Sequence, residues 1–145
     1  MVRHKKGKDI TGWLILDKPR DIGSTQAVNL TRRWFDAKKN GHCGTLDPFA
    51  TGVLPIAFGE ATKLIPLVTE GRKVYEFVVQ WGAATNTGDS EGEVCAVSEK
   101  IPNRNEIRAV LSDFIGEITQ VPPAYSAIKI NGQRAYALAR AGQEV

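Results

Sequence analysis

The residues best suited to chemistry lie in one stretch rich in glycine and proline, Gly41-His42-Cys43-Gly44-Thr45-Leu46-Asp47-Pro48-Phe49-Ala50-Thr51-Gly52-Val53-Leu54-Pro55. It places one carboxylate, Asp47, near one imidazole, His42. Pro48 restricts Asp47 to extended conformations and so fixes its direction. An aspartate held in this way could act as a nucleophile or as a general base. The alternative is a structural turn in which Asp47 caps neighbouring amides.

The elements before this stretch are a strand and a helix. Gly12 to Leu16 forms a compact apolar run stopped by Lys18-Pro19, which predicts a buried strand. Ser24 is suited to cap a helix that continues to about Asp36, and Asn40-Gly41 is expected to break it. The expected inward stripe of the helix is Ala27, Leu30, Thr31, Trp34 and Phe35. Residues 41–59 show little periodicity, so we expect a loop, and a loop of that length is usually functional.

The second half of the chain mixes strands and helices. Residues 73–81 alternate in polarity and predict a strand, and residues 93–97 predict another strand after a polar turn at 85–92. Asn103 and Glu106 are spaced as a capping box for a helix that ends at Gly116, with Ile107, Val110, Leu111 and Phe114 on one face. A strand at 124–130, an Asn131-Gly132 turn and a helix at 134–141 follow. This order predicts an α+β fold, with helices flanking a mixed, largely antiparallel sheet.

Composition excludes several classes of protein. The 145 residues are 42% hydrophobic and 24% charged, as expected of a globular domain, and no apolar run approaches the roughly 20 residues that cross a bilayer. The basic start lacks the apolar segment of a signal peptide, so we expect a cytoplasmic protein whose two cysteines are reduced thiols. Only two histidines and no paired metal-ligand spacing are present, so no metal site is expected.

The positive charge is concentrated in the first third of the chain. Residues 1–46 carry ten Lys or Arg against four Asp or Glu, and residues 47–145 carry nine against twelve. Clustered cations suit a polyanion such as nucleic acid, although a solvated tail and an exposed helix face would give the same count. The cations of the first third include Arg3, Lys5, Lys6, Lys8, Arg32, Arg33, Lys38 and Lys39.

The stretch around Asp47 resembles the catalytic motif of the TruB family of pseudouridine synthases, Gly-His-x-Gly-x-Leu-Asp-Pro-x-Ala-x-Gly-x-Leu-Pro. Every fixed position of that motif matches. Further matching blocks follow the family's order across residues 10 to 141: Asp17-Lys18-Pro19 with Ser24, residues 59–63, 73–75, 85–92 and 121–129, then Gly132, Tyr136 and Ala139-Arg140. Two positions depart from the pattern, since Cys43 stands where a small hydroxyl residue is more usual and Phe49 where an aliphatic one is.

The resemblance implies an isomerase that converts one uridine of folded RNA to pseudouridine without a cofactor. Its expected substrate is the T-loop of tRNA. Asp47 would be the essential carboxylate, and Tyr75 would stack on the displaced uracil and assist proton transfer. His42 would brace the RNA from which the base has been extruded. The structural alternatives are a histidine that only hydrogen-bonds the loop backbone and, for Tyr75, an aromatic side chain of the core. Lys18, Lys63 and Lys129 match family positions at which they would hold phosphates.

The resemblance also implies that the chain is incomplete. Family members run to about twice this length, and an arginine that pairs with the catalytic aspartate lies in their later part, as does a C-terminal RNA-binding domain. We therefore expect residues 1–145 to form the N-terminal part of the catalytic domain. Three alternatives stay open: a catalytically incomplete RNA-binding fragment, a guide-RNA-dependent relative of the dyskerin type, and a metal-free hydrolase that uses Asp47 and His42.

Overall fold

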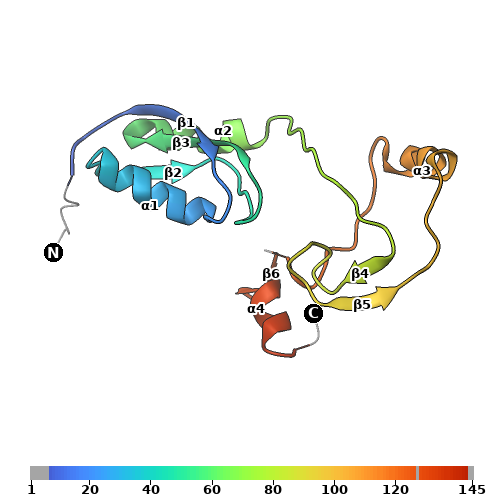
Figure 1. Ribbon diagram of the computed structural model, residues 1–145. Coiled ribbons are helices and arrows are strands. Elements are labelled where there is room, and N and C mark those ends of the chain that lie inside the picture. Colours follow the sequence, from blue (N-terminus) through green and yellow to red (C-terminus); the bar gives the residue numbers. More distant parts are fainter. Residues whose placement is uncertain (1–6, 127, 144–145) are drawn as a thin grey trace. The chain divides into compact units, whose positions relative to one another are not determined.

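The structure, a computed structural model, describes residues 7–126 and 128–143 (Figure 1). The predicted basic residues Arg3, Lys5 and Lys6, and Ala127 of the last predicted strand, lie outside these ranges. The chain divides into two compact units, Met1–Tyr75 and Glu76–Val145. Each unit is described by itself.

A three-stranded antiparallel sheet forms the centre of the first unit. Its strands are β1 (Gly12–Lys18), β2 (Asn40–His42) and β3 (Gly52–Phe58), and β3 lies between the other two. The strand predicted from Gly12 is confirmed as β1. Along β1 burial alternates residue by residue, so one face of the strand is turned to the core and the other to solvent.

Helix α1 (Ser24–Trp34) lies beside this sheet (Figure 1). Its side chains Ala27 and Val28 belong to or pack against the hydrophobic cluster of the sheet. Its buried residues Ala27 and Thr31 recur at a spacing of four, as on one face of a helix. Trp34 was predicted to point inward but is 70% exposed, since the helix has turned it away from the sheet. The buried cluster consists of Ala27, Ala37, Leu54, Ile56 and Phe58.

Both ends of α1 differ from prediction. Gly23, not Ser24, is the N-cap residue, and no side chain caps this end. At the other end Asp36 adopts a left-handed backbone (φ 48°), while the Asp36 amide donates to Arg33 O at 3.1 Å and the Ala37 amide to Arg32 O at 2.9 Å. This is a Schellman motif, and it ends the helix at Trp34, two residues before the predicted end at about Asp36.

The stretch predicted as a long loop, residues 41–59, contains the central strand instead. Leu54, Ile56 and Ala57 of β3 are fully buried or nearly so. The prediction was wrong because the less buried positions of β3 are apolar as well, Val53 (67% exposed) and Pro55, so the sequence is a continuous apolar run without alternating polarity although burial alternates from Val53 to Ile56. The irregular part is reduced to residues 43–51, between β2 and β3.

A 3₁₀-helix, η1 (Gly59–Leu64), and a short helix, α2 (Ile65–Thr69), follow β3. The strand predicted at residues 73–81 does not form. In the part of the chain that the structure describes, no backbone hydrogen bond involves residues 74–81. Its alternating side chains are exposed, including Tyr75 (69%) and Phe77 (78%), because no neighbouring strand pairs with the segment.

In its described residues the second unit contains two hairpins, two α-helices and a 3₁₀-helix. The predicted strand at 93–97 is confirmed, and the one predicted at 124–130 is reduced to its last two residues. The turn that follows has Asn131 and Gly132 at positive φ, as the sequence predicts. The elements are β4 (Ala83–Thr85), β5 (Val94–Val97), α3 (Arg104–Leu111), η2 (Ser112–Phe114), β6 (Lys129–Ile130), β7 (Gln133–Arg134) and α4 (Ala135–Arg140).

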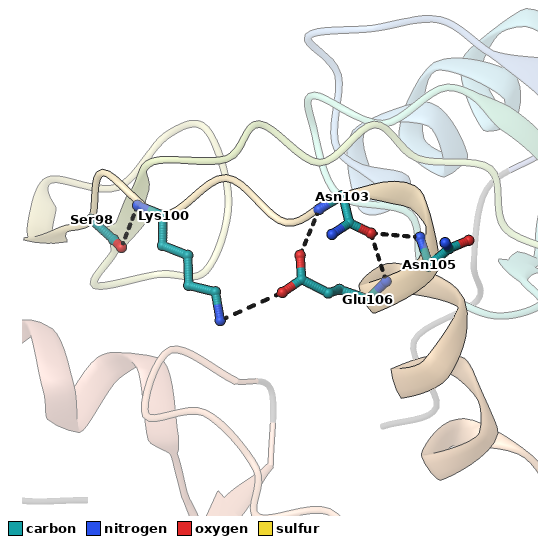
Figure 2. A network of polar contacts seen from close by, with 5 residues as sticks. All are labelled: Ser98, Lys100, Asn103, Asn105 and Glu106. Carbon is teal, nitrogen blue, oxygen red and sulfur yellow. Dashed lines mark hydrogen bonds and ion pairs between the residues drawn. The ribbon is translucent and has the colours of Figure 1, made fainter.

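The predicted capping box at the start of α3 is confirmed (Figure 2). Asn103 Oδ1 accepts from the amides of Asn105 (2.9 Å) and Glu106 (3.1 Å), while Glu106 Oε2 accepts from the Asn103 amide (2.8 Å). Lys100 Nζ lies 3.8 Å from the other oxygen of the Glu106 carboxylate. Of the predicted apolar face, Ile107, Val110 and Leu111 lie on α3 and Phe114 falls on η2, and Val110, Leu111 and Phe114 are 49%, 55% and 67% exposed.

The α+β class predicted from the sequence is confirmed, since helices accompany sheets that are all antiparallel. Among the described residues, every helix is too short or too polar to cross a membrane.

Candidate active site

Asp47 lies in a tight turn between β2 and β3. The Ala50 amide donates to Asp47 O at 3.1 Å and closes the turn. The Asp47 side chain is exposed, and its carboxylate forms no hydrogen bond or ion pair with any residue in the described ranges. The turn is therefore made by the backbone. The alternative from the sequence, in which the Asp47 side chain caps neighbouring amides, is not seen among the described residues. The carboxylate is left available to a ligand.

The residue before Asp47 is fixed to helix α1. The Ser24 hydroxyl donates to Leu46 O at 2.9 Å and accepts from the Leu46 amide at 2.9 Å. Ser24 is 4% exposed, so both bonds are shielded from water. The Ser24 hydroxyl therefore bonds to the loop, whereas the sequence predicted that it would cap the start of α1.

The residue after Asp47 is fixed to the connection between β1 and α1. Pro48 O accepts from the Asp21 amide at 2.7 Å and from Lys18 Nζ at 3.4 Å. Lys18 Nζ also donates to Pro19 O (2.9 Å) and Ile22 O (2.8 Å). The backbone of Asp47 is thus held between two anchored neighbours, which fixes the direction in which its side chain leaves the chain.

The position of Lys18 differs from the expected phosphate contact. Its side chain is fully buried, and its ammonium donates to three carbonyl oxygens, the full number of its protons. A buried ammonium without such acceptors would be strongly unfavourable. The alternation along β1 could have predicted the burial of Lys18, because Leu14, Leu16 and Lys18 share one face and the two leucines pack against the core.

His42 ends β2 and is partly buried. Its Nδ1 is hydrogen-bonded to Gly44 O. A carbonyl only accepts, so Nδ1 carries the proton, and in the neutral ring Nε2 is left as an acceptor. The imidazole is therefore oriented by the same loop that holds Asp47.

Cys43 is buried beside this loop. Its thiol donates to Ile65 O at 3.9 Å, and its amide donates to Pro55 O at 2.9 Å. Burial raises the pKa of the thiol, and a hydrogen bond with Thr69 opposes this rise in pKa only in part. Cys43 therefore has a packing role and is not suited to act as a reactive thiolate.

Lys63 lies on η1 and is exposed. Its ammonium pairs with Glu60, and this hydrogen bond, together with the charge of Lys63, lowers the pKa of the Glu60 carboxyl. The pair is largely solvated, so a phosphate would compete with Glu60 for this cation at modest cost.

The remaining predicted residues are exposed. Tyr75 is the last residue of the first unit and is 69% exposed. Lys129, on β6, belongs to the second unit and pairs in register with Arg134. Within the described ranges, no group of three or more His, Cys, Asp or Glu side chains is arranged to hold a metal ion.

Comparison with solved structures supports the fold. One chain of the crystal structure of a Cbf5-Nop10-Gar1 complex aligns with a TM-score of 0.54 and 29% identity, covering 81% of this chain and 31% of that one. A chain of the archaeal box H/ACA sRNP Nop10-Cbf5 complex aligns with a TM-score of 0.50 and 25% identity over 88% of this chain and 34% of that one.

Comparison with curated proteins gives closer relatives. The tRNA pseudouridine synthase B of Ruegeria sp. (strain TM1040) is 59% identical over all of this chain and 48% of its own length. That of Caulobacter sp. (strain K31) is 56% identical over 99% of this chain and 46% of its own length. The chain thus spans about half the length of these relatives.

A family model described as the N-terminal domain of the TruB family pseudouridylate synthases matches residues 32–145, the greater part of the chain and the part that contains Asp47. The chain belongs to the TruB family of pseudouridylate synthases.

Proposed function

We propose that this chain is the N-terminal part of the catalytic domain of a tRNA pseudouridine synthase that isomerises the T-loop uridine in the cytoplasm. The observation that carries the proposal is the Asp47 carboxylate, which is exposed and without a partner among the described residues, while Leu46 and Pro48 on either side are anchored. Relatives more than 50% identical bear the name tRNA pseudouridine synthase B.

The reaction needs a carboxylate and no redox cofactor. The bond from C1′ to N1 of uracil breaks, the base turns, and a bond from C1′ to C5 forms; C5 loses a proton and N1 gains one. Asp47 would attack the sugar, attack the uracil ring or remove a ribose proton. Preorganisation of the loop backbone supports any of these roles, since a correctly oriented group needs no rearrangement during reaction.

The other candidate residues take subsidiary roles in the proposal. Tyr75 would stack on the extruded uracil, and its hydroxyl would assist proton transfer at C5. The His42 ring, fixed by its bond to Gly44 O, would brace the RNA after extrusion, which itself costs a few kcal/mol. Lys63 and Lys129 would contact phosphates, whereas Lys18 would position the loop and not touch the RNA.

The test is release of tritium from a T-loop RNA hairpin labelled at C5 of the target uridine. Turnover by this chain should fall at least about 100-fold in Asp47→Asn, because the amide neither attacks nor accepts a proton at neutral pH. Unchanged release in Asp47→Asn would eliminate Asp47 as the essential group. The RNA mass must stay constant, and a product of altered mass would point to a hydrolase instead.

The length of the chain favours one second candidate, an RNA-binding fragment that is not active alone. The observation that favours this candidate is that the chain covers about half the length of each relative. If release is absent but appears when the C-terminal half of the Ruegeria enzyme is added, the fragment function is correct. The guide-RNA-dependent alternative is less well supported, because identity to the Cbf5 complex chain is 29% against 59% for the bacterial enzyme.

A further inference from the structure

An open groove of about 610 Å³ lies along helix α1 and ends at Pro48, the residue that follows Asp47. Its volume is within the range of small-ligand sites. The residues that line it are Gly23, Thr25, Gln26, Asn29, Leu30, Arg33 and Pro48.

The polar side chains of this groove have unused hydrogen-bonding capacity. Gln26, Asn29 and Arg33 follow one another at spacings of three and four, so they share one helix face. Within the described ranges, none of these three side chains hydrogen-bonds to the protein or forms an ion pair. Together they offer two amides and a guanidinium to a ligand.

The charge of the groove suits an anion. Arg33 is its only charged residue, and α1 contains two arginines and no carboxylate. The neighbouring Arg32 is used by the fold, since its guanidinium donates to Ala37 O (3.2 Å) and Lys38 O (3.4 Å). Arg33 has no such contacts in the described chain and is exposed.

We infer that this groove binds the RNA strand adjoining the target uridine, with Arg33 on a phosphate and Gln26 and Asn29 on sugar hydroxyls or base edges. The inference rests on the proposed function, because the end of the groove at Pro48 is bonded to the Asp21 amide and lies next to Asp47. A strand that left Asp47 along α1 would meet these donors in succession.

Gly23 allows a side chain to be added at the groove wall without a steric clash at Cβ. Its φ of −76° is ordinary for any residue, and a Cβ added there meets no atom within 4 Å. Gly23→Leu therefore adds an apolar side chain in open space at the groove wall. Arg33→Gln removes the cation, and Asn29→Asp adds a like charge to the phosphates.

The experiment measures the dissociation constant of this chain for a fluorescent T-loop RNA hairpin. We expect each of the three variants to bind about tenfold more weakly. The matched controls Arg108→Gln and Asn105→Asp make the same charge changes outside the groove and should change affinity less than about twofold. A hairpin carrying 4-thiouridine beside the target should crosslink within residues 23–33.

Three outcomes would overturn the inference. These are equal affinity in variants and controls, crosslinks confined to other segments, or no binding by the unaltered chain. Self-association abolished by Gly23→Leu in the absence of RNA would assign the groove to a protein contact and overturn it as well. If the groove variants weaken RNA binding but no tritium release depends on Asp47, the groove is supported as an RNA-binding site and the proposed reaction is contradicted.

Discussion

At the scale of single residues, the turn that contains Asp47 is held by buried side chains. Ser24 and Lys18 hold the residues on either side of Asp47, so the orientation of the carboxylate depends on a hydroxyl and an ammonium that are both buried. Lys18 has the larger role because it joins β1, the β1–α1 connection and the Asp47 turn through three carbonyl oxygens.

Replacement of Lys18 by Met tests this role. The change keeps the length of the side chain but removes the ammonium donor from three carbonyl oxygens, of which Pro48 O keeps its bond from the Asp21 amide, so we expect a loss of about 2 kcal/mol in the free energy of unfolding. Lys63→Met is the control, because its partner Glu60 is solvated, and it should cost less than about 1 kcal/mol. Urea unfolding followed by Trp13 and Trp34 fluorescence in a Trp81→Phe background reports on the first unit. Equal stability of the two variants would contradict the anchoring role.

At the scale of elements, the positions of β2, β3 and η1 decide where the site lies. Gly59 stands at the junction of β3 and η1 with φ +55°, and its amide donates to Lys39 O at 2.9 Å, next to β2. A Cβ at this position would lie 2.3 Å from Ile10 O and 2.6 Å from Thr11 Oγ1. The glycine therefore permits the chain to pass close against the start of β1.

Gly59→Ala should destabilise the first unit by about 2 kcal/mol, because the clash with backbone adds to an unfavourable φ. Gly23→Ala serves as the control, since its backbone is ordinary and its added methyl group meets nothing. Thermal unfolding of the two variants gives the comparison. A melting temperature for Gly59→Ala equal to that of Gly23→Ala would show that the contact with Ile10 relaxes freely.

At the scale of the whole chain, the two units differ in how much they bury. The first contains the hydrophobic cluster around β3 and α1, whereas Ala135 is the only hydrophobic residue of the second unit that is buried among those described. Residues 74–81, at the boundary between the units, have no backbone hydrogen bonds within the described ranges. Stability should therefore be unevenly distributed along the chain.

Amide hydrogen exchange should show this difference directly. We expect slow exchange in β1, β3 and α1 and exchange within minutes in residues 74–81 and in the β4–β5 hairpin, because protection follows burial and backbone hydrogen bonding. Mass spectrometry of peptic peptides at neutral pH measures both regions in one sample. Protection of the β4–β5 hairpin equal to that of β3 would contradict the prediction.

Local patterns in the sequence determined the α+β class, β1, the body of α1, the capping box of α3 and the Asn131-Gly132 turn, because each depends on neighbours a few residues apart. The motif around Asp47 also indicated the family to which the chain belongs. Only the tertiary structure decided that β3 is the central strand and that Lys18 lies inside the fold and anchors Pro48. It also decided that residues 74–81 form no backbone hydrogen bonds with any part of the chain that is described. Strand pairing and burial join residues that are far apart along the chain, and no local spacing specifies which partner each will meet.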